Sequence, residues 1–135
     1  MNRLRCALTV IPAAAVLITA GTATVASATA GTPSGAPPAG VTCVSTTGAK
    51  ACFGAYGDRV WVKDTKANGE SVAGTTKSKL PANWGRECFN DRGEDGGWVM
   101  CNFDVPENQK GELWAVSNPF IGSQAYTEIW TSGFA

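Results

Sequence analysis

Short apolar runs alternate with polar residues along residues 41–135, and turn residues separate these runs at regular intervals. Alternation with a period of two is typical of half-buried strands, and no useful stretch repeats its apolar residues at helical spacing. We therefore expect an all-β domain, a small antiparallel β-sandwich or barrel of about eight short strands. The strands are predicted over residues 42–46, 49–55, 58–66, 70–76, 84–90, 97–104, 111–118 and 124–133.

The clearest turn signal in the chain is Asn68-Gly69. A type I′ hairpin turn needs positive φ at both central residues, and Asn-Gly supplies it at little cost, so this dipeptide predicts a hairpin. The same stretch partly matches a calcium-binding loop that begins at Asp64. Lys66 stands at the third ligand position, where a cation is unfavourable, and Thr75 stands at the twelfth, where such a loop needs a bidentate carboxylate. The hairpin explains these residues better, and we expect no metal ion.

The first 28 residues read as a secretory signal peptide, with basic residues at Arg3 and Arg5, an apolar run and a small-residue end. Cleavage after Ala28 or after Ala30 fits the small-x-small rule, and Ala28 is preferred. The apolar run is too short for a lasting membrane span. We therefore expect a secreted, extracellular protein that has no membrane contact once the signal is removed.

Residues 29–40 are Ala, Gly, Pro, Ser and Thr, with no large apolar side chain to bury. Such a composition does not offset the entropy of ordering, so it predicts a flexible leader. The remaining residues, 41–135, are then one disulfide-stapled β domain of ordinary size. We expect this domain to be a monomer.

The mature chain keeps four cysteines, Cys43, Cys52, Cys88 and Cys101. Export to an oxidising compartment favours disulfides, and the short spacings favour Cys43–Cys52 and Cys88–Cys101, each across one hairpin. Counting back from a two-residue turn at 47–48 places Cys43 directly opposite Cys52. Spacing alone leaves the other two connectivities open. The long spacings disfavour a zinc site.

Three segments resemble small secreted four-cysteine proteins of actinomycetes. These are residues 51–71 (ACFGAYGDRVWVKDTKANGES), 85–88 (GREC) and 101–107 (CNFDVPE). The likeness spans most of residues 43–131. That group has no described function, so the resemblance implies the compartment and the disulfide framework and carries over no active site.

The chain contains no histidine, which excludes Ser-His-Asp and Cys-His catalysis and histidine-bound metals. A carboxylate pair is the remaining route to hydrolysis, but most acidic residues lie near turns, where they are usually solvated. We therefore expect no enzymatic activity and no cofactor. The acidic candidates are Asp58, Asp64, Glu87, Asp91, Glu94, Asp95, Asp104, Glu107, Glu112 and Glu128.

The charge of the domain argues against nucleic acid as a partner. Arg3 and Arg5 fall in the signal, so nine of the 11 Lys and Arg residues remain against all 11 Asp and Glu residues, a net charge of −2. Binding to nucleic acid or to an anionic membrane requires clustered positive charge. We expect an extracellular protein or glycan as the partner instead.

Five tryptophans are many for a domain of this size. Mid-strand positions predict that Trp61, Trp114 and Trp130 belong to the core. Trp84 and Trp98 stand at strand entrances and are predicted to be exposed. An exposed aromatic beside polar groups is a candidate ligand anchor. The predicted ligand contacts are Trp84, Arg86, Trp98 and Tyr56.

These features favour a secreted, non-catalytic binding module that recognises a protein or a glycan, an enzyme inhibitor being one form of it. A stapled scaffold can present a preorganised loop at little entropic cost. Two alternatives stay open: a histidine-free hydrolase that acts on extracellular polysaccharide through two carboxylates, and a structural protein of the cell envelope.

Overall fold

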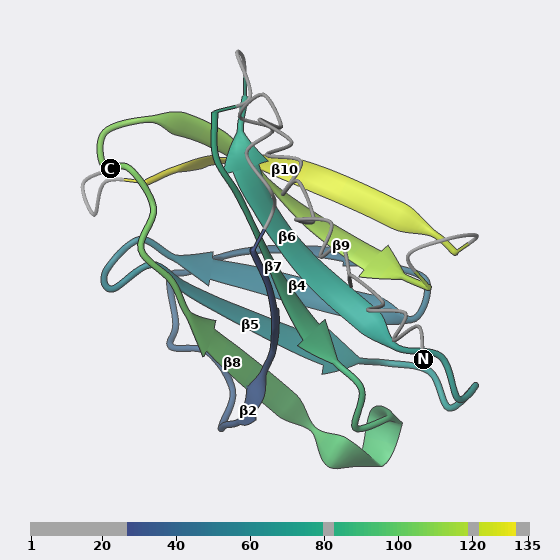
Figure 1. Ribbon diagram of the computed structural model, residues 1–135. Helices are drawn as coiled ribbons and strands as arrows, with labels where there is room; N and C mark the ends of the chain where they lie inside the picture. Colours follow the sequence, from purple (N-terminus) through teal and green to yellow (C-terminus); the bar gives the residue numbers. More distant parts are fainter. Residues whose placement is uncertain (1–26, 80–82, 119–121, 132–135) are drawn as a thin grey trace, which may run out of the picture.

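Two five-stranded sheets pack face to face in the computed structural model, which describes residues 27–79, 83–118 and 122–131 (Figure 1). Sheet A has the order β1-β7-β6-β9-β10, and sheet B has the order β2-β8-β5-β4-β3. The all-β sandwich predicted from the sequence is confirmed. The strands are β1 Ser27–Ala30, β2 Thr32–Pro33, β3 Thr42–Thr46, β4 Ala49–Gly54, β5 Arg59–Asp64, β6 Val72–Ser78, β7 Gly85–Asn90, β8 Trp98–Asn102, β9 Lys110–Ser117 and β10 Gln124–Trp130.

The core lies between the two sheets and follows the two-residue period of the sequence. In β9, Leu113 and Ala115 are fully buried, whereas Glu112 and Trp114 on the other face are half-buried. Short valine and alanine side chains make up most of the facing side of sheet B: Ala49, Ala51, Val60, Val62 and Val99. β-Branched side chains suit such a surface because they pack well on the pleat.

The sheets approach closely where β6 crosses sheet B, and Gly74 allows that approach. A Cβ atom at Gly74 would lie 2.7 Å from Val62 Cγ2 and 3.1 Å from both Ala51 Cβ and Val60 Cγ1. Those neighbours belong to β4 and β5 in the opposite sheet and are fully buried. Glycine is therefore required here for space, because any side chain would push the sheets apart.

Both predicted disulfides are present. Cys43 and Cys52 are direct partners in the β3–β4 ladder, as the strand register predicts. Cys88 and Cys101 lie on the consecutive strands β7 and β8, which belong to different sheets. The first bridge therefore clamps a hydrogen-bonded hairpin. The second closes the turn at 91–97 and also ties sheet A to sheet B.

The hairpin predicted at Asn68-Gly69 is wrong. β5 and β6 lie in different sheets, and residues 65–71 cross between them. Gly69 has a φ of 71°, but the Asn68 backbone is not left-handed; its Oδ1 instead accepts a 3.0 Å hydrogen bond from the Glu70 N–H. An Asx turn of this kind satisfies the backbone locally without a type I′ turn.

The flexible leader predicted over residues 29–40 is paired in part, and the structure differs there from the expectation. β1 runs parallel to β7, and β2 runs antiparallel to β8. The Gly31 N–H donates to Phe89 O at 2.8 Å, and the Ser34 N–H donates to Trp98 O at 2.9 Å. Edge pairing uses only backbone groups, so small side chains suffice for it.

The signal peptide predicted over residues 1–28 lies almost entirely outside the described residues. Its last two residues, Ser27 and Ala28, belong to β1. Among the residues that the structure describes, no helix is both long and apolar enough to cross a bilayer. The helical element described is a single short turn, η1 (Glu94–Gly96).

Asn90 joins β7 to the opposite sheet through its fully buried side chain. Its Nδ2 group donates to Val62 O at 3.1 Å and to Gly97 O at 3.0 Å, and its Oδ1 accepts from the Arg92 N–H at 3.1 Å. Substitution Asn90→Ala is expected to lower the free energy of unfolding by about 1–3 kcal/mol, because it leaves buried polar groups unpaired.

Chemical denaturation followed by tryptophan fluorescence measures this loss. The control is Asn102→Ala at the exposed end of β8, where we expect a change within about 0.5 kcal/mol. Equal losses in the two variants would show that the Asn90 hydrogen bonds add nothing.

Candidate functional site

An open groove of about 520 Å³ lies where the end of β10 meets the β4–β5 turn and the chain that enters β3. We call it the aromatic groove, because four large aromatic side chains contribute to it: Phe53, Tyr56, Trp61 and Trp130. The residues that line it are Pro38, Ala39, Gly40, Val41, Thr42, Phe53, Gly54, Ala55, Tyr56, Arg59, Trp61, Glu128, Ile129 and Trp130.

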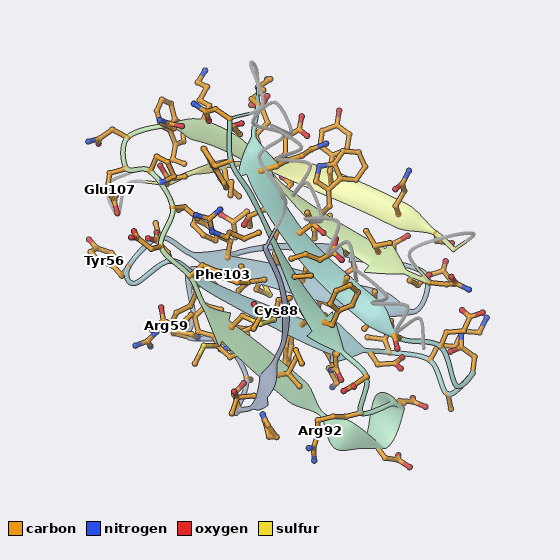
Figure 2. All side chains as sticks on the ribbon, in the orientation of Figure 1. Tyr56, Arg59, Cys88, Arg92, Phe103 and Glu107 are labelled. Carbon is orange, nitrogen blue, oxygen red and sulfur yellow. A yellow bond between two sulfur atoms is a disulfide. The ribbon has the colours of Figure 1, made fainter. Side chains whose placement is uncertain are left out.

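The β4–β5 turn carries Tyr56 to one side of the groove. Gly57 and Asp58 take left-handed conformations, with φ of 81° and 51°. The turn is held by the chain after β8: Asp58 O accepts from the Phe103 N–H at 3.0 Å, and Asp58 Oδ2 accepts from the Val105 N–H at 3.2 Å. Tyr56 therefore stands on a fixed turn, 75% exposed (Figure 2).

The floor of the groove is apolar and buried. Trp61 is 6% exposed, and Phe53 and Ile129 are also buried. Gly54 leaves room for the indole, because a Cβ atom there would lie 3.0 Å from Trp61 Cζ3. A ligand in the groove would therefore rest on aromatic and aliphatic carbon.

Trp130 forms the other side of the groove, at the end of β10. Its side chain is 54% exposed. It faces Lys110 across the β9–β10 ladder, and Lys110 Nζ lies 5.4 Å from its ring centroid. A cation over the ring face favours one orientation of the indole. Trp130 therefore presents an exposed aromatic surface at the groove, with a cation close to its ring.

Two charged residues line the groove. The side chain of Arg59 is exposed, and no hydrogen bond or ion pair joins its guanidinium to a residue that the structure describes, so this group is available to a ligand. It projects outward at the same end of the molecule as Tyr56 (Figure 2). A guanidinium offers five N–H donors in a fixed plane.

Glu128 is the second charged residue, and Lys79 neutralises it. The hydrogen bond from Lys79 Nζ, reinforced by their charge attraction, lowers the pKa of Glu128 and raises the pKa of Lys79. Glu128 thus stays ionised at neutral pH. It is the single carboxylate among the described residues that line the groove.

Of the four predicted ligand contacts, the structure brings Tyr56 alone to the groove. The prediction that Trp84 is exposed is wrong: it is 5% exposed and its Nε1 donates to Gln109 Oε1 at 2.8 Å. Arg86 donates to the backbone oxygens of Gly85 and Asp104. Trp98 is half-buried at the start of β8, with Lys63 Nζ 5.9 Å from its ring centroid.

Sequence reasoning missed Arg59 and placed Trp130 in the core, which is wrong. Trp61 is buried as predicted, and Trp114 is half-buried. The alternation along β10 could have predicted the exposure of Trp130. Trp130 lies two residues after Glu128 and therefore on the same exposed face, whereas the neighbouring Ile129 points to the core. A mid-strand position alone does not say which face a tryptophan occupies.

A second hollow lies beside η1, lined by Lys63, Asp64, Thr65, Glu94 and Asp95. Asp64 is 1% exposed, and its Oδ1 accepts from the Lys66 N–H at 2.9 Å, which is a turn contact. In the part of the chain that the structure describes, no group of three His, Cys, Asp or Glu side chains could hold a metal ion. The hollow is a polar surface depression beside a turn.

The aromatic groove combines three kinds of binding group: exposed ring faces, an apolar floor and a guanidinium without a partner among the described residues. Such a set suits a ligand that has apolar faces and polar edges. Because searches of protein-family models, of curated proteins and of solved structures found no match to this chain, the ligand has to be inferred from this chemistry.

Proposed function

We propose that the protein is a secreted, non-catalytic binding module that takes a neutral glycan in the aromatic groove. One observation carries the proposal: Tyr56 and Trp130, two of the three exposed large hydrophobic residues in the described chain, both line the same concave site. Isolated exposed aromatics are ordinary, but two of them converging on one groove indicate a binding site.

A sugar ring matches the groove better than a folded protein does. Its C–H faces are apolar and pack on ring faces such as those of Tyr56 and Trp130, while its hydroxyls lie at the ring edge and can accept hydrogen bonds from Arg59. A stable protein interface buries about 1,200–2,000 Å² of surface. A concave site of about 520 Å³ favours a small ligand unit.

Binding to soluble oligosaccharides tests this function. Chitohexaose, cellohexaose and xylohexaose are titrated into the folded domain, and tryptophan fluorescence and calorimetry record binding. Because Trp61 and Trp130 line the groove, we expect the fluorescence to change with at least one of these sugars.

Trp130→Ala and Tyr56→Ala are each expected to lower the affinity tenfold or more, a loss of about 1.4 kcal/mol. The matched control is Trp98→Ala, an aromatic truncation on sheet B outside the groove. Failure of all three sugars to bind at millimolar concentration would contradict the proposal and favour a protein partner. An equal loss of affinity in the Trp98 variant would show that the sugar does not bind in the aromatic groove.

A further inference from the structure

The outer face of sheet A continues the aromatic groove along β10. Tyr126, Glu128 and Trp130 alternate on its exposed side. Across the ladder, Tyr126 pairs with Trp114 and Trp130 pairs with Lys110. We call Trp114, Tyr126 and Trp130 the aromatic strip; Trp130 belongs both to this strip and to the groove. The two surfaces are therefore continuous.

The rings of the strip are held in place by their neighbours. Trp114 and Tyr126 stack with centroids 4.7 Å apart and an interplanar angle of 22°. Lys77 Nζ lies 4.7 Å from the Trp114 ring centroid, and Trp114 Nε1 donates to Glu112 Oε2 at 2.9 Å. Aromatic side chains fixed before binding lose little conformational entropy when a ligand arrives.

A purely structural role explains only part of this arrangement. Cross-strand aromatic pairs do stabilise sheets, and Trp114 is half-buried as such a role requires. Tyr126 nevertheless stays 56% exposed on top of the stack, so one ring face remains open to solvent. An ordered, exposed ring next to a groove is available to a ligand that extends beyond the groove.

Most charges around the rings are paired, which favours a neutral ligand over a polyanion; among the described residues of this face, Lys110 beside the Trp130 ring stands outside these pairs. Lys77 Nζ lies 3.7 Å from Glu112 Oε2, and Lys79 pairs with Glu128. These pairs leave polar groups that can exchange hydrogen bonds with hydroxyls, without the clustered positive charge that a polyanion requires.

We infer that the groove and the aromatic strip together bind one linear, neutral polysaccharide chain that runs along β10. This inference rests on the proposed function, because it starts from a sugar in the groove. Tyr126 and Trp130 are four residues apart on one strand, which corresponds to about 13 Å. This span exceeds a single sugar ring, so several consecutive units contact the protein.

Chain length tests the inference. Trisaccharides and hexasaccharides of chitin, cellulose and xylan are titrated into the full domain under the same conditions. For the sugar that binds, we expect the hexasaccharide to bind at least tenfold more tightly than the trisaccharide. Tyr126→Ala is expected to remove most of that gain while leaving trisaccharide affinity unchanged.

Two control variants distinguish the contribution of the groove from that of the aromatic strip. Tyr56→Ala should weaken both lengths, because Tyr56 lies in the groove, and Trp98→Ala should weaken neither. Thermal unfolding of every variant confirms that it is folded. Equal affinities for the two lengths, or a Tyr126 variant that keeps the full gain, would overturn the extended site and leave the groove intact. If no sugar of either length binds, the proposed function fails and the extended site fails with it.

Discussion

Replacement of both Cys88 and Cys101 by alanine is expected to lower the free energy of unfolding by about 2–5 kcal/mol. The bridge closes a sequence separation of 13 residues, and both of its cysteines are buried. It also joins β7 to β8, and thereby sheet A to sheet B. Loss of the bridge raises the conformational entropy of the unfolded chain and leaves a cavity between the sheets in the folded one. Both effects favour unfolding.

Chemical denaturation of the double variant measures this loss, and the matched control removes Cys43 and Cys52. That bridge has a similar sequence separation of 9 residues, but one of its cysteines is exposed and its strands already pair by backbone hydrogen bonds. We therefore expect a smaller loss in the control. Equal losses would show that the connection between the sheets contributes nothing beyond loop entropy.

Substitution Gly74→Val is expected to lower the free energy of unfolding by about 3 kcal/mol, at the upper end for overpacking a core. A first added carbon would already lie 2.7 Å from Val62 Cγ2, a stiff β-branched neighbour that is fully buried. The sheets would have to separate or the surrounding side chains leave their preferred rotamers.

Thermal and chemical denaturation measure this effect. The control is Gly35→Val, since Gly35 is exposed and an added Cβ would meet no atom within 4 Å. The control should stay within about 0.5 kcal/mol of the parent protein. A Gly74 variant as stable as the parent would mean that the two sheets do not pack closely at this point.

The strands themselves could be predicted from the sequence, because each depends on local alternation and local turns. The eight predicted ranges overlap β3 to β10, and the Cys43–Cys52 register follows from a single two-residue turn. The sheet to which each strand belongs could not be predicted in this way. Residues 65–71 look like a hairpin turn, yet they cross between sheets, and no local pattern separates these two outcomes.

The candidate site was only partly predictable for the same reason. Tyr56 was found because it stands in a predicted turn between Ala55 and Gly57, where an aromatic side chain can be exposed. Trp84 and Trp130 were assigned the wrong way round, because burial depends on what the rest of the fold places over each indole. Gln109 and the surrounding core cover Trp84, whereas nothing among the described residues buries Trp130.

The pairing of β1 with β7 links the sandwich to the signal peptide predicted from the sequence. β1 spans Ser27–Ala30, so it contains both predicted cleavage points. A cut after Ala28 leaves Thr29 and Ala30 beside Cys88 and Phe89, whereas a cut after Ala30 removes the strand completely. If the predicted signal is removed, the cleavage point would therefore set which strand is outermost in sheet A, and with it whether the β7 backbone is free to pair with another chain.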